Sequence, residues 1–521
     1  MDTKALRQKI LDLAIRGKLV PQDPNDEPAS VLLERIRAEK QQMVKDGKLK
    51  PKDIKNDTVI FKDDDNLHYE KFSDGIVKCI EDEIPFDVPN NWEWVRIKTA
   101  CVINPRNSID DNTEVSFVPM ANIKEGYANK FISDIRVWKK VKKGYTHFAN
   151  NDIGIAKITP CFENKKSVVF SSLINGYGAG TTELYILRTI SSLVIPEYLL
   201  NFVKRDDFIA GGVLTFSGDV GQQRVTKDYV ANYLFTLPPL NEQQRILNAV
   251  HTATSLIESI EKANDNLIRD IDKTKAKILD LAIRGKLVPQ DSNDEPASVL
   301  LERIRAEKEE LIKQGKIKRD KKESVIFKGD DNSYYQDLPS NWIKIRLSTI
   351  SEIITKGTTP RGGKVAYSRS GIGFLRAENI AGYDKLDLSN LNYVDEESHN
   401  NYLKRSILKE NDILITIAGT LGRTAIVPQQ ALPLNTNQAV AIVRLVNNRL
   451  INVKYLVYAL NSPIIKSDLL AKSVDMAIPN LSLENIADCN ISLPPLAEQK
   501  RIVEAIEKIF AVLDDIANQV A

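Results

Sequence analysis

Apolar positions in the middle of the chain recur at alternating steps of four and three residues. They are Ile246, Val250, Ala253, Ile257, Ile260, Asn264, Leu267, Ile271, Thr274, Ile278 and Leu281, with Asn264 and Thr274 as polar members. This spacing places one stripe along a helix and is typical of a coiled-coil seam. It predicts a helix of about 36 residues, which is about 54 Å long at 1.5 Å per residue.

Both ends of the chain carry the same pattern. The C-terminal seam positions are Ile502, Ile506, Ile509, Leu513, Ile516 and Val520, and the N-terminal ones are Leu6, Ile10 and Leu13. We therefore expect a second helix, assembled from the two termini, that pairs antiparallel with the central one. Asn264 interrupts the central seam. It either fixes the register of the pair or faces solvent.

A long internal repeat explains this match. Residues 9–40 read KILDLAIRGKLVPQDPNDEPASVLLERIRAEK, and residues 277–308 differ from them only where Ser292 replaces Pro24. Further along, VIFK occurs at 59–62 and 325–328, and a Pro-x-Asn-Trp motif occurs at 89–92 and 339–342. LPPLNEQQRIL at 237–247 is echoed by LPPLAEQKRIV at 493–503. Echoes that recur in the same order along the chain indicate repeated structural units.

The order of these pieces indicates a cyclic repeat. In the centre, the LPPL and KILDL segments belong to one continuous block, and 36 residues, 241–276, lie between them. The other copy is divided between the C-terminus and the N-terminus, which together supply 33 residues. We therefore expect the termini to lie close together. The alternative is a simple tandem duplication with altered ends.

Each repeat contains a second helix, which is rich in Glu, Arg and Lys. Gly17 and Gly285 end the first helix, and an Asp-Glu-Pro signal at 26–28 and 294–296 starts another that ends near Gly47 and Gly315. This helix is either a solvated face or a docking surface for another subunit. Docking is favoured, because one unchanged surface presented twice would engage two copies of one partner.

Two variable stretches, 89–238 and 339–494, separate the repeats. Short apolar runs at 167–170, 184–187, 412–417 and 439–445 predict strands, and segments 197–207 and 453–461 predict late helices. Trp92 and Trp342 are expected core anchors. The predicted fold is α+β, with two α/β domains joined by a long antiparallel two-helix coiled-coil spacer in a pseudo-two-fold cyclic repeat. The expected divisions are 1–75, 76–238, 239–330, 331–494 and 495–521.

Charge and chemistry narrow the function. The chain has 521 residues, with 72 Lys and Arg against 70 Asp and Glu, so bulk charge does not drive polyanion binding. Four scattered cysteines, four scattered histidines and the lack of a phosphate loop or an Asn/Asp-Pro-Pro-aromatic motif predict no enzyme activity, metal or cofactor. No apolar run approaches 18 residues and no secretory signal opens the chain, so we expect a cytoplasmic protein that does not contact membranes.

Local basic segments are more informative. Segments 137–148 and 353–377 hold four and five Lys or Arg residues without an acid, beside Gly and aromatic residues. They are either solvated faces or phosphate-contacting surfaces, and their recurrence in both variable domains favours nucleic acid. Amides and Arg in nearby loops suit adenine and guanine. The candidate DNA contacts are Arg106, Lys139, Lys140, Lys142, Lys143, Lys165, Lys166, Gln222, Gln223, Arg224, Lys356, Arg361, Lys364, Arg369, Arg376, Arg423, Asn435, Asn437, Gln438 and Asn480.

The split repeat, the KLVPQDPNDEPASVLLERIRAEK block, the Pro-x-Asn-Trp openings and the LPPLxEQxRI entries resemble the specificity subunit of type I restriction-modification systems. The resemblance covers essentially the whole chain. It implies a non-catalytic, DNA-binding subunit with two target recognition domains, each reading one half of a bipartite site in double-stranded DNA. It also implies helices that dock two methyltransferase subunits, which use S-adenosylmethionine to methylate adenine at N6. Two restriction subunits would use ATP and Mg.

Two other functions stay open at the sequence level. A similar subunit could serve a fused cutting-and-methylating enzyme, which the neighbouring genes would reveal. The chain could also be a protein-interaction scaffold that binds no DNA. A free-standing methyltransferase is a weaker third alternative.

Overall fold

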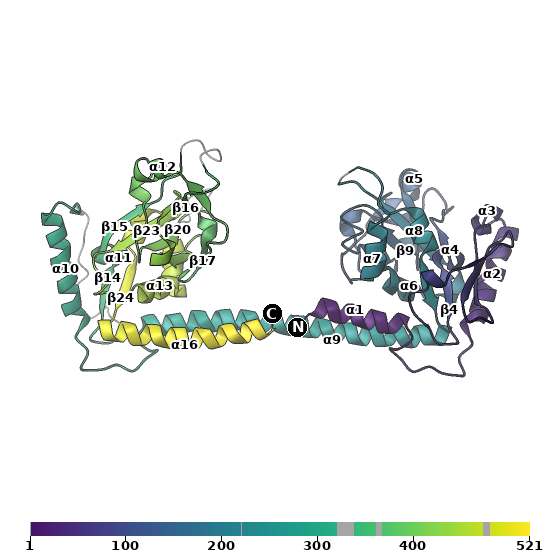
Figure 1. Cartoon of the computed structure of the whole chain (residues 1–521), viewed down its shortest axis with the longest axis horizontal. Helices are drawn as coiled ribbons and strands as arrows, with labels where there is room; N and C mark the ends of the chain where they lie inside the picture. Colours follow the sequence, from purple (N-terminus) through teal and green to yellow (C-terminus); the bar gives the residue numbers. More distant parts are fainter. Residues whose placement is uncertain (1, 220, 320–337, 361–366, 472–479, 521) are drawn as a thin grey trace. The chain divides into compact units, whose positions relative to one another are not determined.

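The repeat in the sequence corresponds to a repeat of structural units. The computed structural model describes residues 2–219, 221–319, 338–360, 367–471 and 480–520. It divides into two units, Met1–Lys262 and Ala263–Ala521, each with helices and one variable domain (Figure 1). Helix α9 (Leu240–Ile283) runs without a break from one unit into the next. Its 44 residues make it about 66 Å long, longer than the predicted 36-residue helix.

In the first unit, α1 (Thr3–Ile15) lies antiparallel to the beginning of α9 (Figure 1). Arg7, near the start of α1, forms an ion pair of 2.9 Å with Glu261. At the other end, the carbonyl of Ile15 accepts a 2.8 Å hydrogen bond from Thr236, just before α9. Ile246 and Ile257 are buried along the predicted seam. The first half of the coiled-coil prediction is therefore confirmed.

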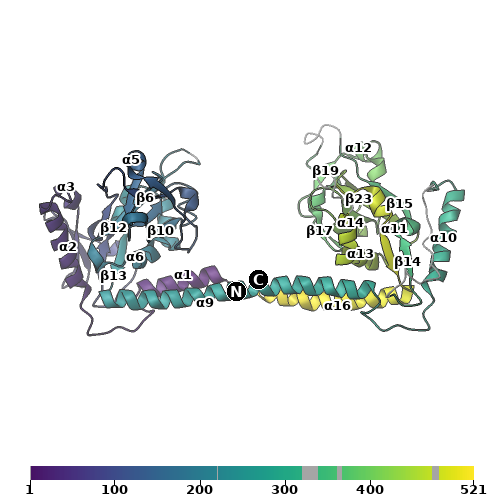
Figure 2. The ribbon, with the colours of Figure 1, turned by 180° about the vertical axis from the view of Figure 1, so that it is seen from behind.

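In the second unit, α16 (Leu496–Val520) lies antiparallel to the rest of α9, as Figure 2 shows from behind. Lys275 of α9 pairs with Asp514 of α16. Asn264 donates a 3.1 Å hydrogen bond from Nδ2 to the carbonyl of Val520. Asn264 therefore contacts the paired helix and fixes the register there, and it does not simply face solvent. The expected closeness of the chain termini stays a prediction.

The second helix of each repeat forms as predicted. These helices are α2 (Ala29–Lys45) and α10 (Ala297–Lys313). The helix before each one ends at a glycine with positive φ, Gly17 at 65° and Gly285 at 66°. A Cβ at either glycine would lie 2.4 Å from Cγ of the proline that opens the variable domain, Pro89 or Pro339. The repeated Gly and Pro motifs are therefore in direct contact.

The first variable domain is built on two four-stranded sheets and a two-stranded one. The first sheet has the order β10 (Ser167–Val169), β9 (Ile153–Ala156), β12 (Leu184–Thr189), β5 (Cys101–Ile103). The second has the order β7 (Asp134–Val137), β6 (Glu114–Val118), β11 (Tyr177–Gly180), β8 (Thr146–Ala149). The third pairs β13 (Leu234–Leu237) with β4 (Glu93–Arg96).

The helices of this domain are α4 (Ile97–Ala100), α5 (Trp138–Val141), α6 (Pro196–Val203), α7 (Asp206–Val213) and α8 (Lys227–Asn232). The single late helix predicted over 197–207 is thus two helices. They are separated at Lys204 and Arg205, and the second begins with two acidic residues that favour a helix N-terminus.

The second variable domain has a related construction. Its main sheet has the order β15 (Ser351–Lys356), β23 (Val440–Leu445), β20 (Ile413–Thr416), β21 (Thr424–Ile426). The others are β19 (Asn392–Val394), β16 (Ile372–Leu375), β22 (Leu434–Thr436); β17 (Ile380–Gly382) with β18 (Lys385–Leu386); and β14 (Ile343–Arg346) with β24 (Asn490–Leu493). Its helices are α11 (Leu347–Ile350), α12 (Glu396–Asn400), α13 (Val453–Asn461), α14 (Pro463–Ala471) and α15 (Leu483–Ala487). The predicted late helix matches α13.

A small insert follows α2 in the first unit. It contains α3 (Pro51–Ile54) and a sheet of β1 (Val59–Lys62), β2 (His68–Lys71) and β3 (Val77–Cys79). Because β3 lies beyond residue 75, this sheet straddles the boundary expected there. The VIFK echo at 325–328 lies outside the described residues.

Each unit has one large core in which the expected anchors sit. Trp92 and Trp342 are 3% and 2% exposed. Each packs with helices of the constant blocks and strands of the variable domain. Among the described residues, no helix is long and apolar enough to cross a membrane.

Candidate nucleic-acid interface

In the second variable domain, several candidates lie where strands of the main sheet end or begin. Lys356 is the last residue of β15, Arg423 directly precedes β21, and Asn437 and Gln438 precede β23. Backbone hydrogen bonds join these ends: Gly357 donates to the carbonyl of Val440 at 3.0 Å, and Thr416 donates to that of Arg423 at 2.9 Å. All four candidates therefore lie at the same end of the sheet, where these strands begin or end. We call this end the strand edge.

Two more candidates reach the same edge. The parallel strands β16 and β22 end together, with Leu375 opposite Thr436, so Arg376 lies beside Asn437. Leu481 donates a 3.1 Å backbone bond to Ile417, just past β20, which brings Asn480 there. We call the resulting set the second-domain edge. It comprises Lys356, Arg376, Arg423, Asn437, Gln438 and Asn480.

The charges at this edge are unevenly neutralised. Arg376 forms an ion pair with Glu378. The guanidinium of Arg423 has no hydrogen bond or ion pair to any described residue. Burial lowers the pKa of Lys466 on α14, and the nearby positive charge of Arg423 lowers it further. Two adjacent cations without an acidic partner attract an anion such as phosphate. Sequence reasoning missed Lys466, because 43 positions separate it from Arg423.

Asn435 does not belong to this surface. It is completely buried, and its amide lies 2.6 Å from Nδ1 of His399. With the amide oxygen turned toward His399, its nitrogen donates to the carbonyl of Ser406 at 2.7 Å. A buried amide with satisfied hydrogen bonds cannot contact a base, so the structure corrects this candidate to a core residue.

The remaining candidates of this domain lie elsewhere. Arg369 is exposed just before β16, at the opposite end of that strand from Arg376. It is therefore not brought to the edge. Arg361 and Lys364 lie outside the described residues.

The first variable domain has an equivalent edge. Lys157 donates to the carbonyl of Glu183 at 3.0 Å, and Val225 donates to that of Lys157 at 2.9 Å. Ile417 makes the same pair of contacts with Ala439 and Leu481 in the second domain. Val225 therefore corresponds to Leu481, and Arg224 occupies the position of Asn480, with Gln222 and Gln223 directly before it. Gln222 is exposed, and Gln223 is half-buried.

Arg224 is held on one side by an acidic residue. It forms a two-bond contact with Glu183, at 2.9 and 3.0 Å, and its third nitrogen donates to the carbonyl of Gln222 at 2.8 Å. These contacts use three of the five guanidinium N–H donors and leave one N–H on each of Nη1 and Nη2. Arg224 therefore holds the loop that presents Gln222 and Gln223, and its contact with a base stays a prediction.

Arg106 lines a hollow of about 290 Å³ at this first-domain edge, together with Tyr145, Lys157 and Thr182. Arg106 is exposed and donates to the carbonyl of Tyr145 at 3.2 Å. Lys157 lies over the ring of Tyr185 at 5.4 Å. Lys157 was not singled out from the sequence, because no basic cluster surrounds it along the chain. The hollow therefore brings two cations, Arg106 and Lys157, together at this edge.

The lysine cluster around α5 begins away from this edge but ends at it, because Lys143 directly precedes Gly144 and Tyr145 of the hollow. Trp138 follows β7 where that strand meets Glu114, at the start of β6, whereas the edge lies at the end of β6. Lys139, Lys140 and Lys143 are exposed. Lys142 is paired with Asp111 at 2.6 Å. Segment 137–148 contains no acidic residue, but Asp111, 31 positions before Lys142 in the chain, supplies one.

Lys165 is also excluded as a DNA contact. It is 7% exposed, and its ammonium group lies 2.5 Å from Asp206 and 3.0 Å from the hydroxyl of Tyr127. A buried, paired lysine has a structural role, which corrects the sequence interpretation. Lys166 beside it is half-buried.

Comparison with known proteins supports a function in DNA recognition. Residues 89–269 and 339–520 match the type I restriction modification DNA specificity domain. The specificity subunit of the type I restriction enzyme EcoEI from Escherichia coli is 35% identical over 99% of this chain and 90% of its own length. That of EcoAI from the same organism is 34% identical over 97% of this chain and 89% of its own.

A solved structure shares the fold. It comes from work on complex assembly and conformational transition of the type I R-M system, and it aligns with a TM-score of 0.57 at 18% identity. The alignment covers 84% of this chain and 94% of the other. The predicted fold class, helices plus sheets in two repeated domains, is confirmed. Because the domain matches cover more than half of the chain and the relatives span nearly all of it, the protein belongs to the family of type I restriction-modification specificity subunits.

Proposed function

We propose that each variable domain reads one half of a bipartite, asymmetric sequence in double-stranded DNA through its strand edge. The carrying observation is that both domains use equivalent backbone contacts, Lys157 with Glu183 and Ile417 with Ala439, to assemble an edge of cations and amides. Cations contact phosphates at any sequence, whereas amides distinguish base edges. The two edges carry different side chains, so the two half-sites differ.

The constant helices α2 and α10 dock two methyltransferase subunits in this proposal. Residues 29–40 of α2 and 297–308 of α10 are identical, whereas the last turns differ, with Gln41 and Gln42 in α2 and Glu309 and Glu310 in α10. Glu27 pairs with Arg35 at 2.6 Å, and Glu295 pairs with Arg303 in the same way. One surface built twice fits two copies of one partner. Two restriction subunits complete the assembly, which acts on DNA in the cytoplasm.

The chain itself is a recognition subunit without catalytic groups in this proposal. S-adenosylmethionine, ATP and Mg bind to the partner subunits. The proposal rests on the sequence, which has neither a phosphate loop nor the Asn/Asp-Pro-Pro-aromatic motif. Labelled S-adenosylmethionine should crosslink to the methyltransferase subunit of the complex and leave this chain unlabelled.

Mapping of N6-methyladenine across the host genome tests the function as a whole. Deleting the gene should abolish methylation at one bipartite motif, and restoring it should restore that motif. Methylation that is unchanged by the deletion would contradict the proposal. Sequence-specific binding by the reconstituted complex should follow the same motif, whereas a protein scaffold would bind no DNA sequence.

A further inference from the structure

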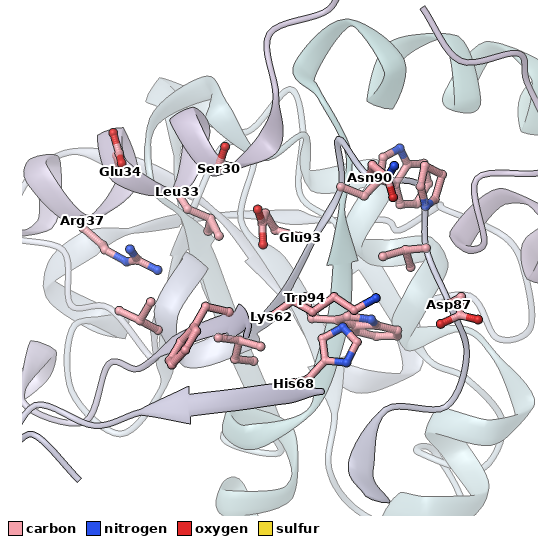
Figure 3. Close-up of a pocket in the computed structure, with 16 residues that line it drawn as sticks. Ser30, Leu33, Glu34, Arg37, Lys62, His68, Asp87, Asn90, Glu93 and Trp94 are labelled. Carbon is pink, nitrogen blue, oxygen red and sulfur yellow. The ribbon is translucent and has the colours of Figure 1, made fainter. Parts of the chain in front are cut away.

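A hollow of about 530 Å³ lies in the first unit, outside both strand edges (Figure 3). Helix α2, strand β1 and strand β4 form its walls. Its side chains include Glu34 and Arg37 from α2, Phe61 and Lys62 from β1, and Glu93 and Trp94 from β4. The hollow thus joins the constant helix proposed for docking to the insert that follows it.

Two opposite charges, Arg37 and Glu93, face this hollow and attract each other across it without a direct hydrogen bond. Figure 3 shows Arg37 extending from α2 and Glu93 lying on β4, on separate walls. Among the described residues, neither group has a hydrogen bond or an ion pair, and Nε of Arg37 is a buried donor without an acceptor. Partly buried charges without a direct hydrogen bond are unfavourable, so a ligand that pairs both would be stabilised.

The other walls suit a polypeptide. Trp94 and Phe61 supply aromatic surface, and the indole nitrogen of Trp94 has no acceptor in the described part of the chain. Strand β1 lies at the end of its sheet, with β2 as its paired strand and β4 in contact with it, so an extended segment would add to the sheet along β1. Glu34, Asp87 and Glu93 together disfavour a phosphate ligand.

The second unit provides an internal comparison. Arg305 on α10 occupies the position of Arg37 within the identical block of the repeat. Strand β14 carries Ile343 and Lys344 where β4 carries Glu93 and Trp94. The helix wall is therefore the same in both units, whereas at this position of the strand the first unit has a carboxylate and the second has Ile343.

We propose that this hollow binds an extended segment of the methyltransferase subunit that carries a Lys or Arg side chain, and that only the first unit binds it. The cation pairs with Glu93, backbone carbonyls of the segment accept from Arg37, and the side-chain stem packs on the aromatic wall. This inference rests on the proposed docking of methyltransferase subunits at α2 and α10. The extra contact in the hollow gives α2 a higher affinity for the methyltransferase subunit than α10 has. The first unit therefore binds its partner more tightly.

Calorimetric titration of the full-length chain with its methyltransferase subunit tests this asymmetry. We expect two sites that differ at least tenfold in affinity. Glu93→Ile, which installs the residue of the second unit, should bring them within about threefold. Arg37→Ala should weaken the tighter site at least tenfold, whereas the matched control Arg305→Ala should leave that site unchanged. Unchanged melting temperatures show that the variants fold.

Equal sites in the wild type, or equal effects of Arg37→Ala and Arg305→Ala on the tighter site, would overturn the inference while leaving the docking proposal intact. No binding at either site would instead refute docking itself. A photo-crosslinking residue at Lys62 identifies the segment. It should capture a methyltransferase peptide that contains Lys or Arg, and Glu93→Ile should abolish that product. A product that survives Glu93→Ile would also overturn the inference.

Discussion

Glu242 accepts a 2.9 Å hydrogen bond from the indole nitrogen of Trp92, 150 positions earlier in the chain. Gln22 donates to the same carboxylate at 2.5 Å. The second unit repeats both contacts, with Glu498 accepting from Trp342 at 2.8 Å. The LPPLxEQ, Pro-x-Asn-Trp and KLVPQ motifs therefore meet at one buried carboxylate in each unit. They recur because they join the constant helices to the variable domain.

We predict that Trp92→Phe lowers the free energy of unfolding by about 1–3 kcal/mol. A smaller aromatic ring remains, and the carboxylate of Glu242 loses a donor in a buried site. Denaturant unfolding measures the change. Trp94→Phe is the matched control, because the indole nitrogen of Trp94 has no acceptor among the described residues. An equal loss for both variants would contradict a specific role of the Trp92 bond.

The same carboxylates predict a dependence of stability on pH. Burial raises the pKa of Glu242 and of Glu498 despite their hydrogen bonds. The unfolded chain therefore releases these protons at lower pH than the folded chain, so ionisation favours unfolding as the pH rises above the ordinary Glu pKa of about 4.3.

Glu242→Gln and Glu498→Gln should remove this dependence. The stability of the wild type relative to the double variant should fall as the pH rises through the window between the ordinary and the raised pKa values. Unfolding free energies measured at several pH values give the comparison. A constant difference, or one that grows in favour of the wild type, would refute the assignment.

Arg423 should supply a phosphate contact in the second domain. We expect Arg423→Ala to weaken DNA binding by the reconstituted complex by about 1–3 kcal/mol and to reduce the salt-dependence slope by about one. Its guanidinium and the adjacent Lys466 have no acidic partner among the described residues. Arg369→Ala, at the far end of β16, is the control. If Arg369→Ala weakens DNA binding more than Arg423→Ala does, the second-domain edge is not the DNA-binding surface.

Arg224 should act through Glu183. Glu183→Gln keeps the size of the side chain but weakens the two-bond contact, so it should relax selectivity at one half-site much as Arg224→Ala does. Binding to DNA libraries randomised in each half-site measures this effect. If Arg224→Ala relaxes selectivity and Glu183→Gln does not, Arg224 contacts a base directly.

The sequence predicts the helices better than it predicts the interface. A seam such as that of α9 depends on neighbours three and four residues away, so its period is visible in one dimension. The same holds for Gly17 and Gly285 at helix ends. These local signals account for the constant blocks and for the strands of the variable domains.

Partners far away in the chain decide which candidate side chains are available. Lys165 and Arg224 look like free cations until the fold brings Asp206 and Glu183 against them, each 41 positions away. Asn435 looks like a loop amide until β22 places it beside His399. Conversely, Lys466 becomes a candidate only because α14 packs near Arg423. Burial and long-range pairing carry no local sequence signal.

Exchange of one variable domain tests the central claim, that two independent readers share one chain. The measurement is N6-methyladenine mapping in cells whose complex contains residues 89–238 from another specificity subunit. The account predicts that one half of the methylated motif changes, while the other half and the distance between them stay the same. A change in both halves, or no change in either, would contradict it.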